Sequence, residues 1–161
     1  MRRARSTHVK VPPFQSFLDD HREEVYRFLA GFAVPHEVDD TFQETFISAL
    51  RAYPELRNGT NLRSWVLTIA YRKAMDSHRS RARRAVPVKD LPEQPSRGSQ
   101  AEDHALWDLV RALPEKQRAA VVQRFAVGLP YREIGSILDC TEEAARQNVR
   151  EGLKKLKEMM S

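Results

Sequence analysis

The strongest constraint on the fold lies in the last third of this 161-residue chain, where three runs of apolar residues repeat at helical spacing. A break of only three residues, Asp139 to Thr141, separates the second run from the third, and Thr141 is placed to cap the helix that follows. Two short amphipathic helices on either side of so short a break predict a helix-turn-helix, which presents a recognition helix to a DNA major groove. The apolar residues of the three runs are Val121, Val122, Phe125 and Ala126, then Tyr131, Ile134, Ile137 and Leu138, then Ala145, Val149, Leu153, Leu156 and Met160.

The outward face of the last of these helices is rich in basic and amide side chains, among them Arg146, Gln147, Arg150 and Lys154. Such side chains form hydrogen bonds with base edges and ion pairs with phosphates. A plain three-helix bundle with a solvated basic face is the alternative, because helix-turn-helix patterns also occur without DNA binding. The segment favours the DNA-binding interpretation.

The overall charge supports an anionic partner, since the net charge is +5 and the sequence pI is near 9.6. No apolar run approaches the length of a bilayer-spanning helix, and no apolar core follows the basic N-terminus, so we expect neither a membrane segment nor a secretory signal. The single cysteine, Cys140, excludes an intrachain disulfide. We expect it to act as a small apolar residue in a protein of the reducing cytoplasm, with a redox sensor as the less favoured alternative.

The composition changes near residue 85 and divides the chain. Residues 85–100 contain three prolines, a glycine and two serines without periodicity, and they predict an extended, flexible linker. Before them, helical spacing predicts helices beginning near residues 14, 38 and 62. We therefore expect an all-α protein with a basic tail (1–13), a helical domain (14–84), a Pro-rich linker (85–101) and a helix-turn-helix domain (102–161).

The predicted helix over residues 38–50 has one apolar face and one acidic face. An acidic face in a basic protein is poorly suited to phosphates, so contact with another protein is the favoured interpretation over a merely solvated surface. A metal site at Asp39 and Asp40 is much less favoured, because adjacent residues point in different directions on a helix and no histidine lies at useful spacing.

The predicted helix over residues 61–84 combines aromatic residues with the most basic run of the chain. Trp65 lies at core spacing from Ile69, so we expect it to be buried, whereas Tyr71 lies off that stripe and is the better candidate for stacking on an unpaired base. The preceding loop, residues 58–62, offers amide and hydroxyl groups that could hold an extruded base, or it is a simple turn.

Together these segments resemble the extracytoplasmic-function (ECF, group IV) sigma factors of the bacterial sigma-70 family. The resemblance covers nearly the whole chain after residue 13, with VDDTFQETF, LRSWVLTIAYRKAMDSHRSRAR and LPEKQRAAVVQRFAVGLPYREIGSIL leading into TEEAARQNVREGL in the family's order. It implies a region 2-like helical bundle and a region 4-like helix-turn-helix, which would bind core RNA polymerase and read the minus-ten and minus-thirty-five promoter elements. It also implies an anti-sigma partner.

The resemblance carries a set of site residues over to this chain. For core polymerase binding they are Asp39, Asp40, Gln43, Glu44, Phe46 and Ile47. For the minus-ten element they are Asn58, Thr60, Asn61, Arg63, Tyr71, Arg72, Lys73, Asp76, Arg79 and Arg83. For the minus-thirty-five element they are Arg132, Thr141, Glu142, Arg146, Gln147, Asn148, Arg150 and Lys154.

The chain departs from the family pattern at several of these places. Arg72 stands where the family often has Asn, which affects the expected minus-ten sequence. Glu143-Ala144-Ala145 replaces the usual Gly-Thr-Val, and Asn148 and Glu151 replace frequent arginines. Asp139 replaces the usual turn glycine, and because Asp tolerates the left-handed backbone we expect the turn to survive.

The sequence therefore predicts a non-enzymatic sigma factor that directs core polymerase to promoters and aids their melting, with no cofactor and no metal. A sigma mimic that titrates an anti-sigma factor is one rival, although a decoy has no need of the arginines after residue 78. A dimeric repressor or activator is a second rival, in which the linker and the acidic helix are superfluous. An enzyme acting on nucleic acid is the least favoured, because no carboxylates lie at metal-binding spacing.

Overall fold

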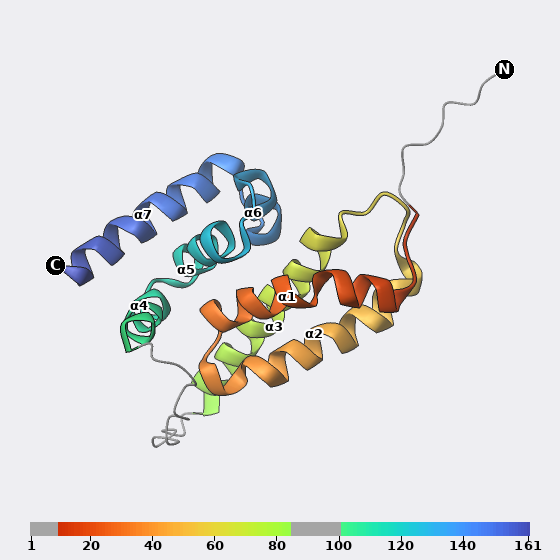
Figure 1. Ribbon diagram of the computed structural model, residues 1–161, viewed down its shortest axis with the longest axis horizontal. Coiled ribbons are helices and arrows are strands. Elements are labelled where there is room, and N and C mark those ends of the chain that lie inside the picture. The colour runs from red at the N-terminus through yellow and green to blue at the C-terminus, as the bar shows by residue number, and fades with distance from the viewer. Residues whose placement is uncertain (1–9, 85–100) are drawn as a thin grey trace.

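The computed structural model describes residues 10–84 and 101–161, and every regular element in these two ranges is helical (Figure 1). The predicted all-α fold is confirmed. The predicted flexible linker lies outside the described residues, apart from Ala101, as does most of the basic tail. In chain order the α-helices are α1 (Phe14–Phe32), α2 (Val38–Ala52), α3 (Leu62–Arg84), α4 (Ala101–Arg111), α5 (Glu115–Val122), α6 (Tyr131–Leu138) and α7 (Glu142–Met160). Short 3-10 helices occupy Pro35–Glu37 and Tyr53–Glu55, and a π-helical turn occupies Gln123–Val127.

The first three helices pack around an aromatic core. The ring of Phe17 is fully buried, and its centroid lies 5.7 Å from that of Trp65 and 6.1 Å from that of Phe46. Fully buried aliphatic residues from α1 and α3 complete this core: Val25, Leu29, Val66 and Leu67. Trp65 is half-buried and packs against this core, so its side chain faces the side that its helical spacing predicted. Burial of such rings is the main stabilising term of a bundle of this size.

Helices α5, α6 and α7 form the helix-turn-helix half. At the turn, Asp139 adopts the left-handed conformation with φ 56°, so the prediction that Asp would preserve the turn is confirmed. The Thr141 hydroxyl accepts a hydrogen bond from the Ala144 amide at 3.0 Å, which confirms it as the cap of α7. A Cβ added at Gly135 would lie 2.7 Å from the carbonyl oxygen of Cys140, so α6 meets the turn closely because this position is glycine.

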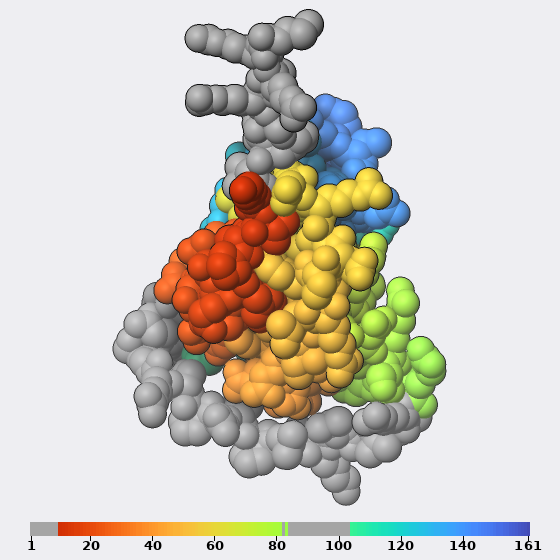
Figure 2. Space-filling view, turned by 90° about the vertical axis from the view of Figure 1, so that its right-hand side faces the viewer, coloured from red at the N-terminus to blue at the C-terminus, as the bar shows by residue number. Residues whose placement is uncertain are grey.

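The two halves of the chain pack against each other, an arrangement that the sequence did not predict. Helix α1 contacts α4, α5 and the π-helical turn, and α3 contacts α6. Helices α5 and α6 thus lie between α7 and the α1–α3 bundle (Figure 1). Viewed from the end of the molecule where the loop between α2 and α3 lies, residues of that loop border residues of the C-terminal half (Figure 2).

Several expectations about individual apolar residues are wrong. Tyr71 is only 9% exposed and packs on Phe32 with ring centroids 5.5 Å apart, because α1 covers the part of α3 that was expected to face solvent. Phe125 is 62% exposed, since the π-helical turn inserts an extra residue and breaks the 3.6-residue period of the first apolar run. Leu153 is also exposed, because it lies off the covered stripe of α7, whose residues Gly152 and Leu156 on either side of it are buried. Met160 is exposed in the last turn of the helix.

Candidate nucleic-acid interface

The outer face of α7 carries the polar side chains expected to contact duplex DNA. Arg150 and Lys154 are exposed, and neither has an acidic partner within 4 Å among the described residues. Gln147 donates a hydrogen bond to Glu151 at 3.0 Å. Asn148 donates one to the Ala144 carbonyl at 3.0 Å, so its amide group is turned back toward its own helix. Arg150 and Lys154 are therefore the most available cations of this face.

Arg146 is held in place by acidic residues of the same helix and by an aromatic ring. Its guanidinium pairs with Glu143 at 2.5 Å and with Glu142 at 3.4 Å, and it lies 4.9 Å from the centroid of the Tyr131 ring. Arg124 lies 4.4 Å from the same ring centroid. Sequence reasoning missed these roles of Tyr131 and Arg124, although an aromatic residue at the start of α6 beside a basic face is a recognisable signal. Arg146 can meet DNA only by giving up or sharing its carboxylate partners.

The other expected DNA-contacting set begins in the loop before α3. The Asn61 side-chain carbonyl accepts a hydrogen bond from the Ser64 amide at 3.1 Å and so caps α3. Gly59 has φ 87°, and the Thr60 hydroxyl donates to the Arg57 carbonyl at 2.7 Å, so the loop is a tight turn. The side-chain carbonyl of Asn58 accepts from the Val11 amide at 3.2 Å, which ties the loop to the chain before α1.

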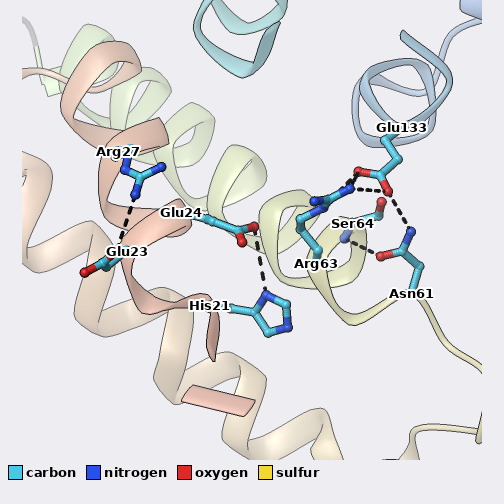
Figure 3. A network of polar contacts seen from close by, with 8 residues as sticks. All are labelled: His21, Glu23, Glu24, Arg27, Asn61, Arg63, Ser64 and Glu133. Atoms are coloured by element: carbon cyan, nitrogen blue, oxygen red, sulfur yellow. Dashed lines mark hydrogen bonds and ion pairs between the residues drawn. The ribbon is translucent and has the colours of Figure 1, made fainter. Parts of the chain in front are cut away.

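Two members of this set are bound to the opposite half of the molecule (Figure 3). Arg63 forms a bidentate ion pair with Glu133 of α6, with Nε and Nη2 donating to the carboxylate at 3.0 and 2.8 Å. Asn61 also donates to this carboxylate, at 3.0 Å. Burial opposes ionisation of Glu133, but the hydrogen bonds from Arg63 and Asn61 and the charges of Arg63 and Arg132 outweigh it and lower the pKa of Glu133. Sequence reasoning missed Glu133.

The basic end of α3 is partly available to solvent. Arg72, Asp76, Arg79 and Arg83 are exposed, and Lys73 is half-buried. Arg81, one of the arginines after residue 78, is paired with Glu37 at 2.6 Å. Tyr71 is buried, and burial raises the pKa of its hydroxyl, so stacking of Tyr71 on a base does not fit this arrangement.

The acidic helix α2 presents a mixed acidic and apolar face. Asp39, Asp40, Gln43 and Glu44 are exposed, and Ile47 is 48% exposed. Phe46 is only 8% exposed and packs on Phe17 and Phe42, so its expected place in a contact surface is wrong for this structure.

A shallow pocket between α1 and α2 continues this face. Its lining includes Tyr26, Asp39 and Phe42. Tyr26 is 48% exposed, and its ring meets Phe42 edge-on at 5.9 Å. Sequence reasoning did not single out Tyr26, because a tyrosine beside a core stripe has no signal of its own.

Other kinds of site find little support in the part of the chain that the structure describes. No group of three or more His, Cys, Asp or Glu residues there could hold a metal ion. No helix in residues 10–84 or 101–161 is long and apolar enough to cross a bilayer. Cys140 is half-buried, and burial raises the pKa of its thiol, which disfavours the reactive thiolate.

Two known protein families match the two halves of the chain. The model of Sigma-70 region 2 matches residues 17–84, and that of Sigma-70, region 4 matches residues 103–156. The ECF RNA polymerase sigma factor ShbA of Streptomyces griseus is 33% identical over 135 residues, which are 76% of this chain and 71% of that relative. The chain belongs to the ECF sigma factors of the sigma-70 family. This sigma factor is also 32% identical over 130 residues to SigD of Mycobacterium tuberculosis, which are 74% of this chain and 61% of that relative.

Solved structures share the fold of this sigma factor. The sigma factor RpoE in complex with the anti-sigma factor NepR, from Bartonella quintana, gives a TM-score of 0.80 at 20% identity, covering 91% of this chain and 96% of that one. CnrH in complex with the cytosolic domain of CnrY gives 0.72 at 21% identity, covering 91% and 86%. At these identities the likeness concerns the fold.

Proposed function

We propose that this ECF sigma factor, a member of group IV, is an initiation factor without catalytic activity of its own that binds core RNA polymerase in the cytoplasm and reads two promoter elements. The observation that carries the proposal is the separation of three surfaces of different chemistry on one chain. They are the exposed acidic and apolar face of α2, the loop and helix α3, and the basic outer face of α7. A repressor or a nucleic-acid enzyme has no evident use for the first surface.

The α2 face is the proposed docking surface for core polymerase. Exposed carboxylates at Asp39, Asp40 and Glu44 precede the exposed Ile47 on α2, and an exposed apolar residue beside charged ones is typical of a protein-binding surface. The pocket beside Asp39 and Tyr26 offers a place for a side chain of the partner. Phe46 is buried beneath this surface, so it packs in the core and does not contact the partner.

The loop and α3 are proposed to capture the minus-ten element as the duplex opens. Arg72, Arg79 and Arg83 are exposed for phosphates, and Asn61 and Arg63 stand at the N-terminal end of the same helix. No hydrolysis is required, because unstacking costs a few kcal/mol per base step and binding of the flipped bases offsets it.

Helix α7 is proposed to read the minus-thirty-five element through the major groove. Arg150 and Lys154 suit phosphates or guanine, and Gln147 suits adenine. Glu142 and Glu143 lie in the first turn, where they neutralise Arg146, so this recognition helix depends on fewer cations than its basic composition suggests.

An anti-sigma factor is a further proposed partner. Two solved proteins of this fold, RpoE and CnrH, form complexes with NepR and with the cytosolic domain of CnrY. The exposed apolar residues of this chain, among them Ile47, Leu50 and Phe125, suit a partner that covers it while it is inactive.

Transcription of a fragmented genomic library by bacterial core polymerase, with and without this protein, tests the proposal by mapping RNA 5′ ends. New start sites that share two upstream motifs are expected. Binding to core polymerase without new starts would favour a sigma mimic, and neither binding nor new starts would favour a simple DNA-binding regulator.

The variant Asp40→Ala should weaken binding to core polymerase about fivefold to tenfold, because it removes a charge from the proposed docking surface. Biolayer interferometry on immobilised core polymerase measures this directly. Glu158→Ala, which removes an exposed carboxylate from the far end of α7, is the matched control. Equal losses in the two variants would place the docking surface elsewhere.

A further inference from the structure

The chain before α1 is a short, stiff segment that lies against the loop between α2 and α3 (Figure 2). It consists of Val11, Pro12 and Pro13, and we call these three residues the N-terminal strap. A proline ring fixes φ at about −65°, and a residue before proline is confined to extended backbone, so the strap has few conformations to lose. Pro13 has φ −54° and ψ 147°, and its carbonyl accepts from the Phe17 amide at 3.1 Å, so the strap leads directly into α1.

Two hydrogen bonds tie the strap to the segment that connects α2 with α3. The Val11 amide donates to the side-chain carbonyl of Asn58 at 3.2 Å. The Tyr53 hydroxyl donates to the Pro12 carbonyl, and Tyr53 belongs to the 3-10 helix that leads into the loop. The strap therefore holds both the beginning and the middle of this connecting segment.

Tyr53 gives the strap a fixed support. Its ring is half-buried, and the ring centroid lies 5.2 Å from those of Phe14 and Phe17 and 6.2 Å from that of Trp65. Contact with three aromatic rings restricts the side chain, and burial raises the pKa of its hydroxyl, which therefore remains a donor above neutral pH. The Pro12 carbonyl is thus bound to a donor whose own position is fixed by the core.

The Val11 amide decides how the Asn58 side chain is turned. An asparagine side chain has a carbonyl that accepts and an NH2 group that donates, and it can present either to a ligand. Because a backbone N–H only donates, the atom of Asn58 that faces Val11 is the carbonyl oxygen. The carbonyl is thereby held at the strap, and the Nδ2 donors are the part of this exposed side chain that is left to meet a base.

Other polar side chains of the loop are fixed by local hydrogen bonds. The Thr60 hydroxyl donates to the Arg57 carbonyl at 2.7 Å, and the Asn61 side-chain carbonyl accepts from the Ser64 amide at 3.1 Å. Each of these bonds spans three residues and forms whenever the turn and the first turn of α3 form. The side chain of Asn58 is instead fixed by a residue 47 positions away in the sequence. Its orientation therefore depends on the strap and not on the turn.

We propose that the N-terminal strap determines minus-ten specificity: it fixes Asn58 with its Nδ2 donors available to an unpaired base, so that the loop selects a base with an acceptor at that point. Val11 acts through its amide and Tyr53 through its hydroxyl, and both are positioning residues that need not touch DNA. The inference rests on the proposed capture of the minus-ten element by this loop. An Asn58 side chain released from the strap can present either end of its amide, so it discriminates less between bases.

Two variants break the strap contacts by independent routes. Val11→Pro removes the amide that binds Asn58 and keeps the extended backbone, to which a residue before proline is already confined. Tyr53→Phe removes the hydroxyl that binds Pro12 and keeps the ring in its aromatic contacts. Val11→Ala, which keeps the amide, is the matched control for the first variant. Ser16→Ala, which removes an exposed hydroxyl from α1, is the control for the second.

Nuclear magnetic resonance relaxation of the full 15N-labelled chain tests the strap without any DNA. In the unmodified protein and in both controls, the order parameter of the Asn58 side-chain amide should be that of a rigid group, about 0.85. In Val11→Pro and Tyr53→Phe it should fall below about 0.6. An Asn58 amide that is already mobile in the unmodified protein, or one that stays rigid in both variants, would overturn the proposal.

Transcription by core polymerase tests what the strap does for promoter reading. The templates carry each of the four bases in turn at every minus-ten position of a promoter found with the genomic library. In Val11→Pro and Tyr53→Phe, the ratio of transcript from the preferred base to transcript from the next best base should fall about fivefold at one position, as expected for loss of one oriented hydrogen bond. The ratios at the other positions should not change. Unchanged ratios at every position, or an equal loss of transcript on every template, would overturn the specificity role.

Thermal denaturation followed by circular dichroism separates this role from a general loss of the fold. The melting temperatures of all four variants should lie within about 5 °C of the original value, because each removes at most one hydrogen bond or a small side chain. A variant that melts much earlier and transcribes every template poorly would give the strap a structural role only. Failure of the promoter proposal would be seen separately, as an absence of new start sites with the unmodified protein, while the relaxation result would still decide whether the strap fixes Asn58.

Discussion

Two arginine–glutamate pairs stand at the two expected DNA-reading surfaces, and they differ in how they are made. Arg146 pairs with Glu142 and Glu143, which lie four and three residues away on its own helix. Arg63 pairs with Glu133, which lies 70 residues away on the opposite half. The first pair is local and forms wherever α7 is helical, whereas the second exists only while the halves are closed. The same pairing of arginine with glutamate therefore partly neutralises an exposed surface on α7 and covers a surface at the start of α3.

A disrupted helix-turn-helix core should have the largest effect on the free energy of unfolding. It removes the packing that supports α7 and, with it, the distant pair between Arg63 and Glu133. Ile134 is fully buried, and Ile134→Ala should lower the free energy of unfolding by about 2–5 kcal/mol. Urea denaturation followed by circular dichroism measures the loss. The control is Ser136→Ala, an exposed change on the same helix, which should stay within about 0.5 kcal/mol of the original value.

Replacing each arginine in turn compares the contributions of the two pairs to stability. Arg63→Ala leaves the mostly buried carboxylate of Glu133 without its ion pair and should cost about 1–3 kcal/mol in urea denaturation. Arg146→Ala loses a surface pair and should cost less than about 1 kcal/mol of stability.

In binding to duplex DNA, Arg146→Ala should have the larger effect of these two variants. Arg146→Ala should lose about 1–3 kcal/mol of discrimination between minus-thirty-five sequences if Arg146 reads a base. Gel-shift titrations against matched and mismatched duplexes measure it. A uniform loss on every sequence would instead make Arg146 a phosphate contact.

The distant pair should also respond to acid. Arg63 and Asn61 face Glu133 from α3 and its loop, Arg132 neighbours it on α6, and the charge of Glu24 on α1 acts on Arg63. Because the pKa of Glu133 is lowered in the closed chain, its stabilisation of closure is fully present above the ordinary glutamate pKa and is lost as the pH falls through the lowered value.

Small-angle X-ray scattering at pH values from 7 down to below the ordinary pKa of glutamate should therefore show expansion once the pH has fallen through the lowered pKa of Glu133. Helix content, followed by circular dichroism, must stay constant over the pH range used. In Glu133→Gln the radius of gyration should already be large at pH 7 and should change little. A transition of equal size in that variant would assign the acid response to other carboxylates.

The smallest effect is expected from loosening the local pair. Glu143→Gln removes one partner of Arg146 at an exposed position and should change the free energy of unfolding by less than about 0.5 kcal/mol. It should strengthen duplex binding by a few-fold and steepen its dependence on salt, since a negative charge near phosphates is lost. Glu158→Gln, at the other end of α7, is the control for net charge.

Much of this molecule was predictable from local pattern. The starts of α1, α2 and α3, the cap at Thr141, the left-handed Asp139 and the core position of Trp65 all follow from spacing and from residue type. The same reasoning failed at Tyr71 and Phe125. The first is buried by a neighbouring helix, and the second is turned outward by a π-helical turn. Periodicity reports one face of one helix and contains no information on what packs against its other faces.

Capping and amphipathic spacing act over a few residues, so the helices, the helix-turn-helix and the chemistry of each exposed face follow from local sequence. Which of those faces are available depends on packing between the two halves of the chain. The pairing of Glu133 with Arg63 and the fit of Trp107 over Gly31 depend on residues far apart in the chain, and their energies arise only when the two halves meet. A sequence pattern specifies a surface, and packing decides whether that surface is open.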